Sequence, residues 1–150
     1  MRYRKILILG AARSGRSWLA RSLAEVTGIR CWDPGAQGVD AAHVRAEARA
    51  EATWILEEHV AAPDREAFDE ADLVVLLRTP LWLRALRSAR GYLRGERRVS
   101  AATAPTEGRA SPNSDPLTLA GERGFLCRSS DDVRRLLDEV VGVDSAPPAN

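Results

Sequence analysis

Short apolar segments alternate along this chain with stretches in which apolar residues recur every three or four positions. The apolar segments cover residues 6–9, 29–32, 53–56, 73–77 and 124–127. The stretches with helical spacing cover residues 15–27, 40–51, 64–70, 80–94 and 131–141. Buried strands that alternate with amphipathic helices are typical of a parallel sheet wound with crossover helices. The pattern therefore predicts an α/β fold with a mainly parallel, five-stranded sheet.

The segment over residues 99–123 breaks this alternation. It is rich in Ser, Thr, Pro, Ala and Gly and has almost no periodicity, so it is predicted to be a long mobile loop. Residues 144–150 are predicted to be a disordered tail. A chain of 150 residues suits one hydrophobic core, and we expect a single domain over residues 1–143.

A glycine-containing turn joins the first apolar segment to the first helix. It has the spacing of the phosphate-binding loop G-x-x-x-x-G-K-[ST], except that arginine replaces lysine, and it reads Gly10-Ala11-Ala12-Arg13-Ser14-Gly15-Arg16-Ser17. In such loops the backbone amides point at phosphate oxygens at the N-terminus of a helix, whose dipole favours anions. A strand-to-helix turn with no ligand is the alternative. Because strand, turn and helix fall in register, we favour a P-loop in which all eight residues cradle the phosphates of a nucleotide.

Two positions of this turn carry further predictions. Ser17 stands where the P-loop hydroxyl binds Mg²⁺. Arg16 stands where lysine would reach the β- and γ-phosphates, in a chain whose only lysine is Lys5. A planar guanidinium attracts phosphate but is bulkier than an ammonium and prefers bidentate contacts. We expect Arg16 to bind phosphate and to position it less well for transfer.

Acidic residues follow two of the predicted strands, and ligands of parallel sheets bind beyond the carboxyl ends of the strands. Asp33 ends the second strand and is a candidate for holding Mg²⁺ or substrate, or it forms the turn before Pro34-Gly35. Glu57 ends the third strand and is a candidate for substrate or metal binding, whereas Glu58 is expected to be solvated. The fourth strand ends in Arg78, which cannot bind Mg²⁺ as an aspartate there would.

The predicted helix 80–94 carries a stripe of arginines. Their spacings of three, three and four place them on one face, and they are Arg84, Arg87, Arg90 and Arg94. Guanidinium groups near a P-loop neutralise charge on a transferring phosphoryl group. A solvated basic face and a nucleic-acid groove are alternatives, although no aromatic residues interleave with these arginines to stack on bases.

Bulk properties exclude several function classes. The formal net charge is +1, so there is no overall attraction to nucleic acid or membranes. No apolar run approaches the roughly 20 residues that cross a bilayer, and we expect a cytoplasmic protein. The cysteines, Cys31 and Cys127, lack metal-ligand spacing and are expected to be small buried hydrophobes. The histidines, His43 and His59, are isolated in the sequence, with no nearby cysteine or histidine that would suggest a metal site.

The chain resembles the adenylate-kinase-like P-loop kinases, and most of all the DNA topology modulation (FlaR-type) family of nucleotide kinases. The resemblance covers most of residues 4–98 and, more weakly, 124–138. Besides the P-loop it rests on Trp32-Asp33 before Pro34-Gly35, on the segment 53–57, and on the segment 71–77 before Pro80 and Trp82. It implies a three-layer P-loop NTPase fold with strand order 2-3-1-4-5. Against the family pattern, arginines stand at positions 16 and 78, Glu57 replaces an aspartate, and the loop 99–123 replaces a lid.

The turn also resembles that of adenosylcobinamide kinases, which commonly reads G-G-A-R-S-G-K-S, and Leu81-Trp82-Leu83 is similar to their L-W-L. Both resemblances imply a phosphotransferase that uses ATP or GTP with Mg²⁺. In that hypothesis Arg16, Arg87 and Arg90 are catalytic and the acceptor is small and nucleotide-like. The alternative is a non-catalytic descendant that keeps phosphate binding as a regulatory or interaction module. The acceptor, the preferred base and the oligomeric state are not indicated by the sequence.

Overall fold

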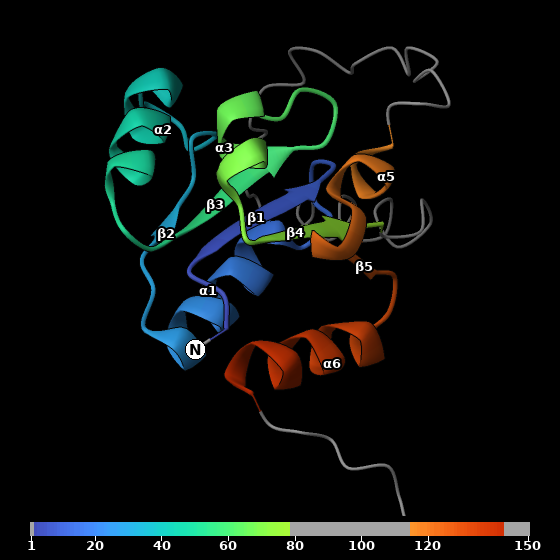
Figure 1. Ribbon diagram of the computed structural model, residues 1–150. Coiled ribbons are helices and arrows are strands. Elements are labelled where there is room, and N and C mark those ends of the chain that lie inside the picture. The colour runs from blue at the N-terminus through green and yellow to red at the C-terminus, as the bar shows by residue number, and fades with distance from the viewer. Residues whose placement is uncertain (1, 79–114, 143–150) are drawn as a thin grey trace, which may run out of the picture.

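Five parallel strands form one sheet in the order β2-β3-β1-β4-β5 (Figure 1). The computed structural model describes residues 2–78 and 115–142. The strands are β1 (Lys5–Gly10), β2 (Cys31–Trp32), β3 (Trp54–His59), β4 (Leu73–Leu77) and β5 (Gly124–Cys127). The predicted fold class and strand order are confirmed.

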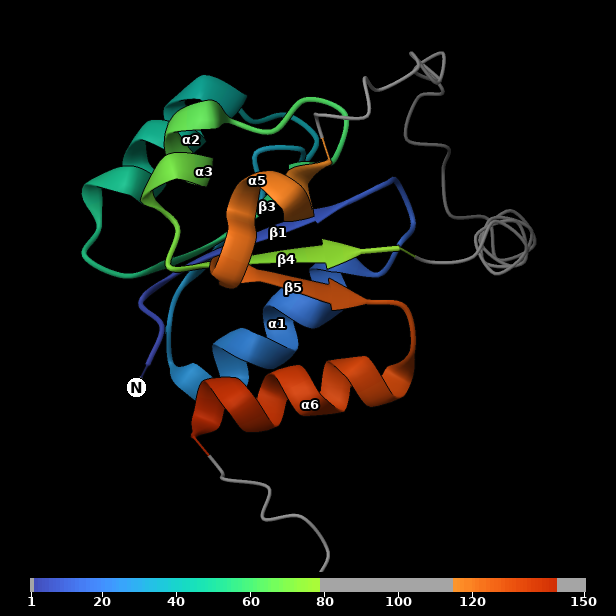
Figure 2. The ribbon, with the colours of Figure 1, turned by 45° about the vertical axis from the view of Figure 1, so that its right-hand side comes forward.

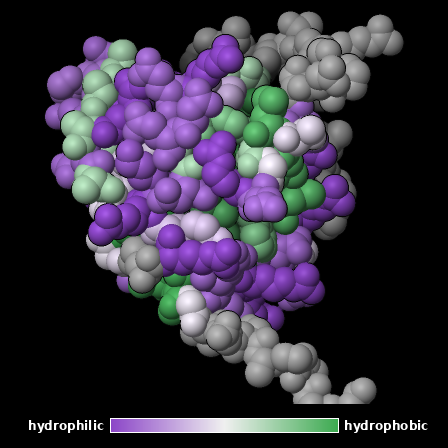
Figure 3. Space-filling view, in the orientation of Figure 1, coloured by the Kyte–Doolittle hydropathy of each residue, from purple (hydrophilic) through white to green (hydrophobic). Residues whose placement is uncertain are grey.

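Helices cover both faces of the sheet and give three layers (Figures 1 and 2). One face is covered by α1 (Arg16–Thr27) and α6 (Ser130–Val141). The other is covered by α2 (Ala41–Ala50), α3 (Arg65–Glu70) and α5 (Pro116–Ala120), with a 3-10 turn over Gly121–Arg123. Apolar side chains gather on the surface over α5, whereas the surface over α2 and α3 is strongly polar (Figure 3).

The sheet separates two hydrophobic cores, and β1 contributes side chains to both. Successive side chains of a strand point to opposite faces, so Ile6 and Ile8 pack under α1 and α6 while Leu7 and Leu9 pack under α2 and α3. All four side chains are fully buried. This explains why the first strand of the chain is a continuous apolar run rather than an alternating one.

The observed elements differ from the predicted ones at three places. The third strand continues to His59, so Glu57 and Glu58 lie inside β3 rather than at its end. The second strand is shorter than predicted. The expected loop 99–123 is wrong over residues 115–123, where Asp115 caps α5 and Pro116 occupies its first turn.

Several predictions fall on residues outside the described ranges. These are the helix 80–94 with Arg84, Arg87, Arg90 and Arg94, the loop residues 99–114, and the tail 144–150. Within residues 2–78 and 115–142, no helix has the length and apolar character needed to cross a membrane.

Candidate functional site

The turn between β1 and α1 has the backbone of an anion-binding loop. Two of its residues adopt left-handed conformations, Arg13 with φ 60° and Gly15 with φ 100°. Gly15 is the N-cap of α1, and among the described residues no side chain caps this helix. Side chains do cap the other α-helices, namely Asp40, Asp64, Asp115 and Ser129. The first amides of α1 are therefore available to a phosphate.

Gly10 allows this turn to pack tightly on the end of β1. An ideal Cβ at position 10 would lie 2.5 Å from Ser14 Oγ and 3.0 Å from Arg16 Cγ. The Arg16 side chain thus packs against the backbone of Gly10. The first glycine of the motif is required by this close approach.

Ser17 and Glu57 form the polar centre of the site. Ser17 donates a hydrogen bond to Glu57, with 2.8 Å between Oγ and Oε2. Glu57 is 4% exposed, and burial raises the pKa of its carboxyl group. The hydrogen bond from Ser17 and the positive charges of Arg16 and Arg21 lower this pKa, whereas the negative charge of Asp33 raises it further. A hydroxyl and a carboxylate in contact at the N-terminus of a helix are suited to hold a divalent cation beside phosphate.

Asp33 and Cys31 extend the polar centre toward β2. Asp33 Oδ1 accepts a hydrogen bond from the Gly35 amide at 2.9 Å, so the turn-forming interpretation of Asp33 is correct. Its charge also raises the pKa of both Glu57 and Cys31, which places it beside the site as well. Cys31 Sγ lies 4.0 Å from Glu57 Oε1, and burial is the largest cause that raises the pKa of this thiol. The Cys31 thiol is thus uncharged and lies beside Glu57.

His59 ends β3 beside the turn, at a position that the predicted third strand does not reach. It pairs in register with Gly10, and the Val60 amide donates to the Gly10 carbonyl at 3.2 Å. His59 Nδ1 accepts from the Ala61 amide at 3.2 Å, so the proton of the neutral ring is on Nε2. Alternation along β3 puts His59 on the same face as Glu57. A predicted third strand that continued three residues further, to His59, would have placed this residue on the Glu57 face.

Glu58 corrects an expectation, since it is buried and not solvated. Its side chain is 3% exposed on the face opposite to Glu57. Arg45 of α2 holds both oxygens, with Nε at 2.5 Å and Nη2 at 3.0 Å. Glu58 therefore anchors α2 to β3 and faces away from Ser17.

Arg78 also serves the opposite face. Its Nη2 lies 2.8 Å from Asp115 Oδ2, the carboxylate that caps α5, and its amide donates to the Cys127 carbonyl at 3.0 Å. Leu77 belongs to the core under α1, so alternation turns Arg78 away from the P-loop. Arg78 therefore links the end of β4 to α5, on the face of the sheet opposite to Ser17 and Glu57. Arg87 and Arg90 lie outside the described residues.

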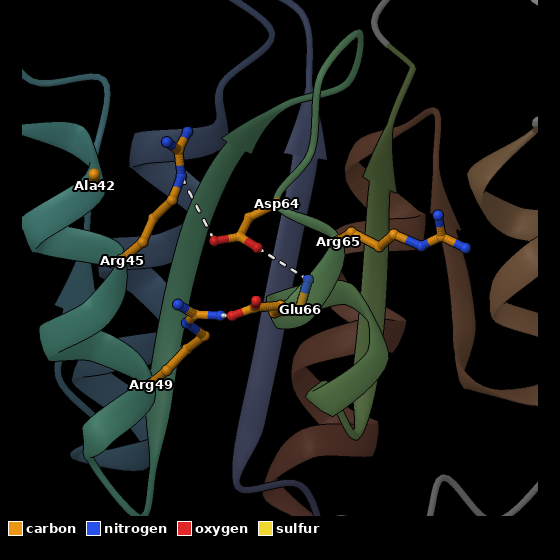
Figure 4. A pocket seen from close by; sticks show the side chains of 6 residues that line it. All are labelled: Ala42, Arg45, Arg49, Asp64, Arg65 and Glu66. Carbon is orange, nitrogen blue, oxygen red and sulfur yellow. Dashed lines mark hydrogen bonds and ion pairs between the residues drawn. The ribbon is translucent and has the colours of Figure 1, made fainter.

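A pocket of about 360 Å³ opens between α2 and α3 on the face opposite to the P-loop helix (Figure 4). Its lining residues are Ala42, Arg45, Arg49, Asp64, Arg65 and Glu66. Arg45 is paired with Glu58, Arg49 is paired with Glu66, and Arg65 points away from the pocket (Figure 4). Ion pairs thus already engage most of the charged groups that line this pocket.

Comparison with known proteins finds likeness in structure alone. No family model matches the chain, and no curated protein matches it. Shikimate kinase from Acinetobacter baumannii in complex with shikimate is similar with a TM-score of 0.56 and 18% identity, over 95% of this chain and 96% of that one. Shikimate kinase from Aquifex aeolicus has a TM-score of 0.53 and 13% identity, over 91% and 96%. A gluconokinase from Sinorhizobium meliloti has a TM-score of 0.53 and 16% identity, over 93% and 90%.

These likenesses agree with the strand order of the sheet. The resemblances to the DNA topology modulation family and to adenosylcobinamide kinases stay predictions. What the comparisons and the topology establish together is that this chain has the fold of the P-loop kinases.

Proposed function

We propose that this chain binds the triphosphate of ATP or GTP with Mg²⁺ in the turn Gly10–Ser17 and transfers the terminal phosphoryl group to a small acceptor. The observation that carries the proposal is the hydrogen bond from Ser17 to the buried carboxylate of Glu57, directly below an uncapped helix N-terminus. A turn that served only to connect β1 to α1 would need neither a buried acid there nor free helix amides.

The residues present fit a magnesium ion. Mg²⁺ is usually held by one or two carboxylates together with phosphate oxygens and water. Ser17 and Glu57 supply a hydroxyl and a carboxylate, and Asp33 supplies a second carboxylate nearby. Among the described residues no three His, Cys, Asp or Glu side chains cluster as metal ligands, in keeping with an ion that takes most of its ligands from phosphate and water. When bound, the ion would neutralise charge on the triphosphate.

The arginine at position 78 is not, in this proposal, a sign that catalysis has been lost. The sequence suggested a lost acid at the end of β4, but the acid in contact with the P-loop comes from β3, the neighbour of β1. Arg16 remains the one departure within the cradle itself. It favours a second candidate function, a module that binds nucleotide without turnover, because a guanidinium positions phosphate differently from an ammonium.

The acceptor belongs on the side of the site that Asp33 and Glu57 line. There Asp33 is placed to bind an acceptor hydroxyl, and Arg87 and Arg90 stay our candidates for screening the transferring charge. The names of the similar structures, shikimate kinase and gluconokinase, support a small hydroxyl-bearing acceptor. This class is broader than the nucleotide-like acceptor expected from the sequence.

Calorimetry with Mg-ATP and Mg-GTP, followed by a turnover assay, tests the proposal. Wild type should bind at least one of them, and Ser17→Ala should weaken Mg²⁺-dependent binding about tenfold or more, since a lost hydrogen bond to a charged group costs about 1.5–3 kcal/mol. The matched control is Ser22→Ala, one turn further along α1, where the hydroxyl bonds only to the Trp18 carbonyl.

Two outcomes of this experiment would count against a catalytic function. If neither nucleotide binds to wild type, the proposal is wrong. If a nucleotide binds but no acceptor is phosphorylated, and Arg16→Lys restores turnover, the binding module is the correct function.

A further inference from the structure

The first turn of α1 presents a tryptophan to solvent. Trp18 follows Ser17 directly and is 60% exposed, whereas Trp32 and Trp54 are buried. Tryptophan carries a large aromatic face and is highly buried on average in folded proteins. Such a face next to a phosphate cradle offers what a nucleobase needs, because bases stack on aromatic side chains whatever their hydrogen-bonding edge.

The helix directs Trp18 away from the metal and acceptor side of the site. Successive residues of an α-helix are about 100° apart. Ser17 points to Glu57 of β3, and Leu19 is buried against the sheet. Trp18, between these two in sequence, therefore lies on the helix face remote from the sheet. The polar groups and the aromatic face are thus separated around one helical turn.

A second helix, α6, packs beside α1. α1 and α6 contact one another and both follow parallel strands, so both begin at the carboxyl edge of the sheet (Figures 1 and 2). The turn that joins β5 to α6 carries Arg128 and Ser129, whose amides are bonded to Asp132.

We propose that Trp18 is the platform on which the purine base of the bound ATP or GTP stacks. The phosphates bind at the amides of residues 13–17, and the base lies against the indole of the next residue. This inference rests on the proposed function. It assigns the two ends of the nucleotide to two groups of residues that can be changed independently.

The experiment compares Mg-ATP with Mg-tripolyphosphate, which has the phosphates but no base. Wild type should bind Mg-ATP more tightly. Trp18→Ala should weaken Mg-ATP about 5- to 100-fold and leave Mg-tripolyphosphate unchanged, whereas Trp18→Phe should retain most of the difference. The matched control is Val26→Ala, which removes another half-exposed apolar side chain of α1 two turns away and should change neither affinity. Circular dichroism establishes that each variant is folded, and Trp18→Phe supplies the comparison if Trp18→Ala is not.

The outcomes separate the two proposals. If wild type binds neither compound, the proposed function fails. If wild type binds both with equal affinity, or if Trp18→Ala leaves the Mg-ATP affinity unchanged or weakens both compounds equally, the phosphate site stands and the stacking platform is wrong.

Discussion

Gly10→Ala tests whether the turn is a phosphate cradle with no room for a side chain. The added Cβ would lie 2.5 Å from Ser14 Oγ and 3.0 Å from Arg16 Cγ. Ser14 is 3% exposed, so its hydroxyl cannot move into solvent without opening the turn. Overpacking of this kind costs about 1–3 kcal/mol. At about 2–4 °C per kcal/mol for a chain of this size, the melting temperature should fall by roughly 2–12 °C.

The same substitution should weaken nucleotide binding. If the turn opens enough to lose one amide-to-phosphate hydrogen bond, worth about 1.5–3 kcal/mol for a charged acceptor, Kd rises roughly 10- to 150-fold. Thermal unfolding without ligand gives the first effect, and calorimetry with Mg-ATP gives the second. Ligand-induced stabilisation follows RT ln(1 + [L]/Kd) and checks the two measurements against each other.

Two variants control for general effects of replacing glycine. Gly28→Ala at the C-cap of α1 has φ 70° and nothing within 4 Å of the new Cβ, so it should cost about 1 kcal/mol in stability and leave the affinity unchanged. Adding Ser14→Ala to Gly10→Ala removes the shortest contact and should restore part of the lost stability. The reasoning is refuted if Gly10→Ala alone changes neither the melting temperature nor the affinity.

Three further predictions concern the surrounding structure. Burial raises the pKa of Glu57, so the contribution of this side chain to stability is full below the ordinary glutamate value of 4.5 and is lost as pH rises through the folded pKa. At neutral pH, Glu57→Gln should therefore unfold at a higher denaturant concentration than wild type. The difference should shrink toward pH 4, and a difference that does not change with pH would contradict this. Arg45→Ala leaves the buried Glu58 carboxylate without its partner and should lower the unfolding free energy by about 3 kcal/mol in urea titrations, whereas a loss under 1 kcal/mol would mean that water solvates Glu58. Ser129→Ala removes the reciprocal cap with Asp132 and should cost about 1 kcal/mol, measured in the same way, with nucleotide affinity unchanged.

The sequence predicted those parts of the fold that depend on local pattern. The run Ile6 to Leu9 is apolar because β1 is buried on both faces, and the turn from Gly10 to Ser17 has a spacing that only a few backbone paths satisfy. Both predictions needed no knowledge of distant residues. The strand order came from the resemblance to P-loop kinases, and the structure agrees with it.

The roles of individual charged residues were harder to predict because they depend on long-range packing. Glu57 and Glu58 are adjacent and chemically identical, yet one meets Ser17 of α1 and the other meets Arg45 of α2. Arg78 was interpreted as a lost acid because its partner, Asp115, is distant in sequence. No local signal distinguishes a charge that faces a ligand from one that anchors a helix.

The position of β1 in the sheet has a consequence for the synthesis of this protein. Both hydrogen-bonding edges of β1 pair with strands that are synthesised after it, β3 and β4. At about 5–20 residues per second, β1 waits roughly 3–13 seconds before Leu77 has been added. During that interval at least one edge of its apolar run has no strand to pair with. The nascent chain should therefore be a client of ribosome-associated chaperones until the fourth strand emerges.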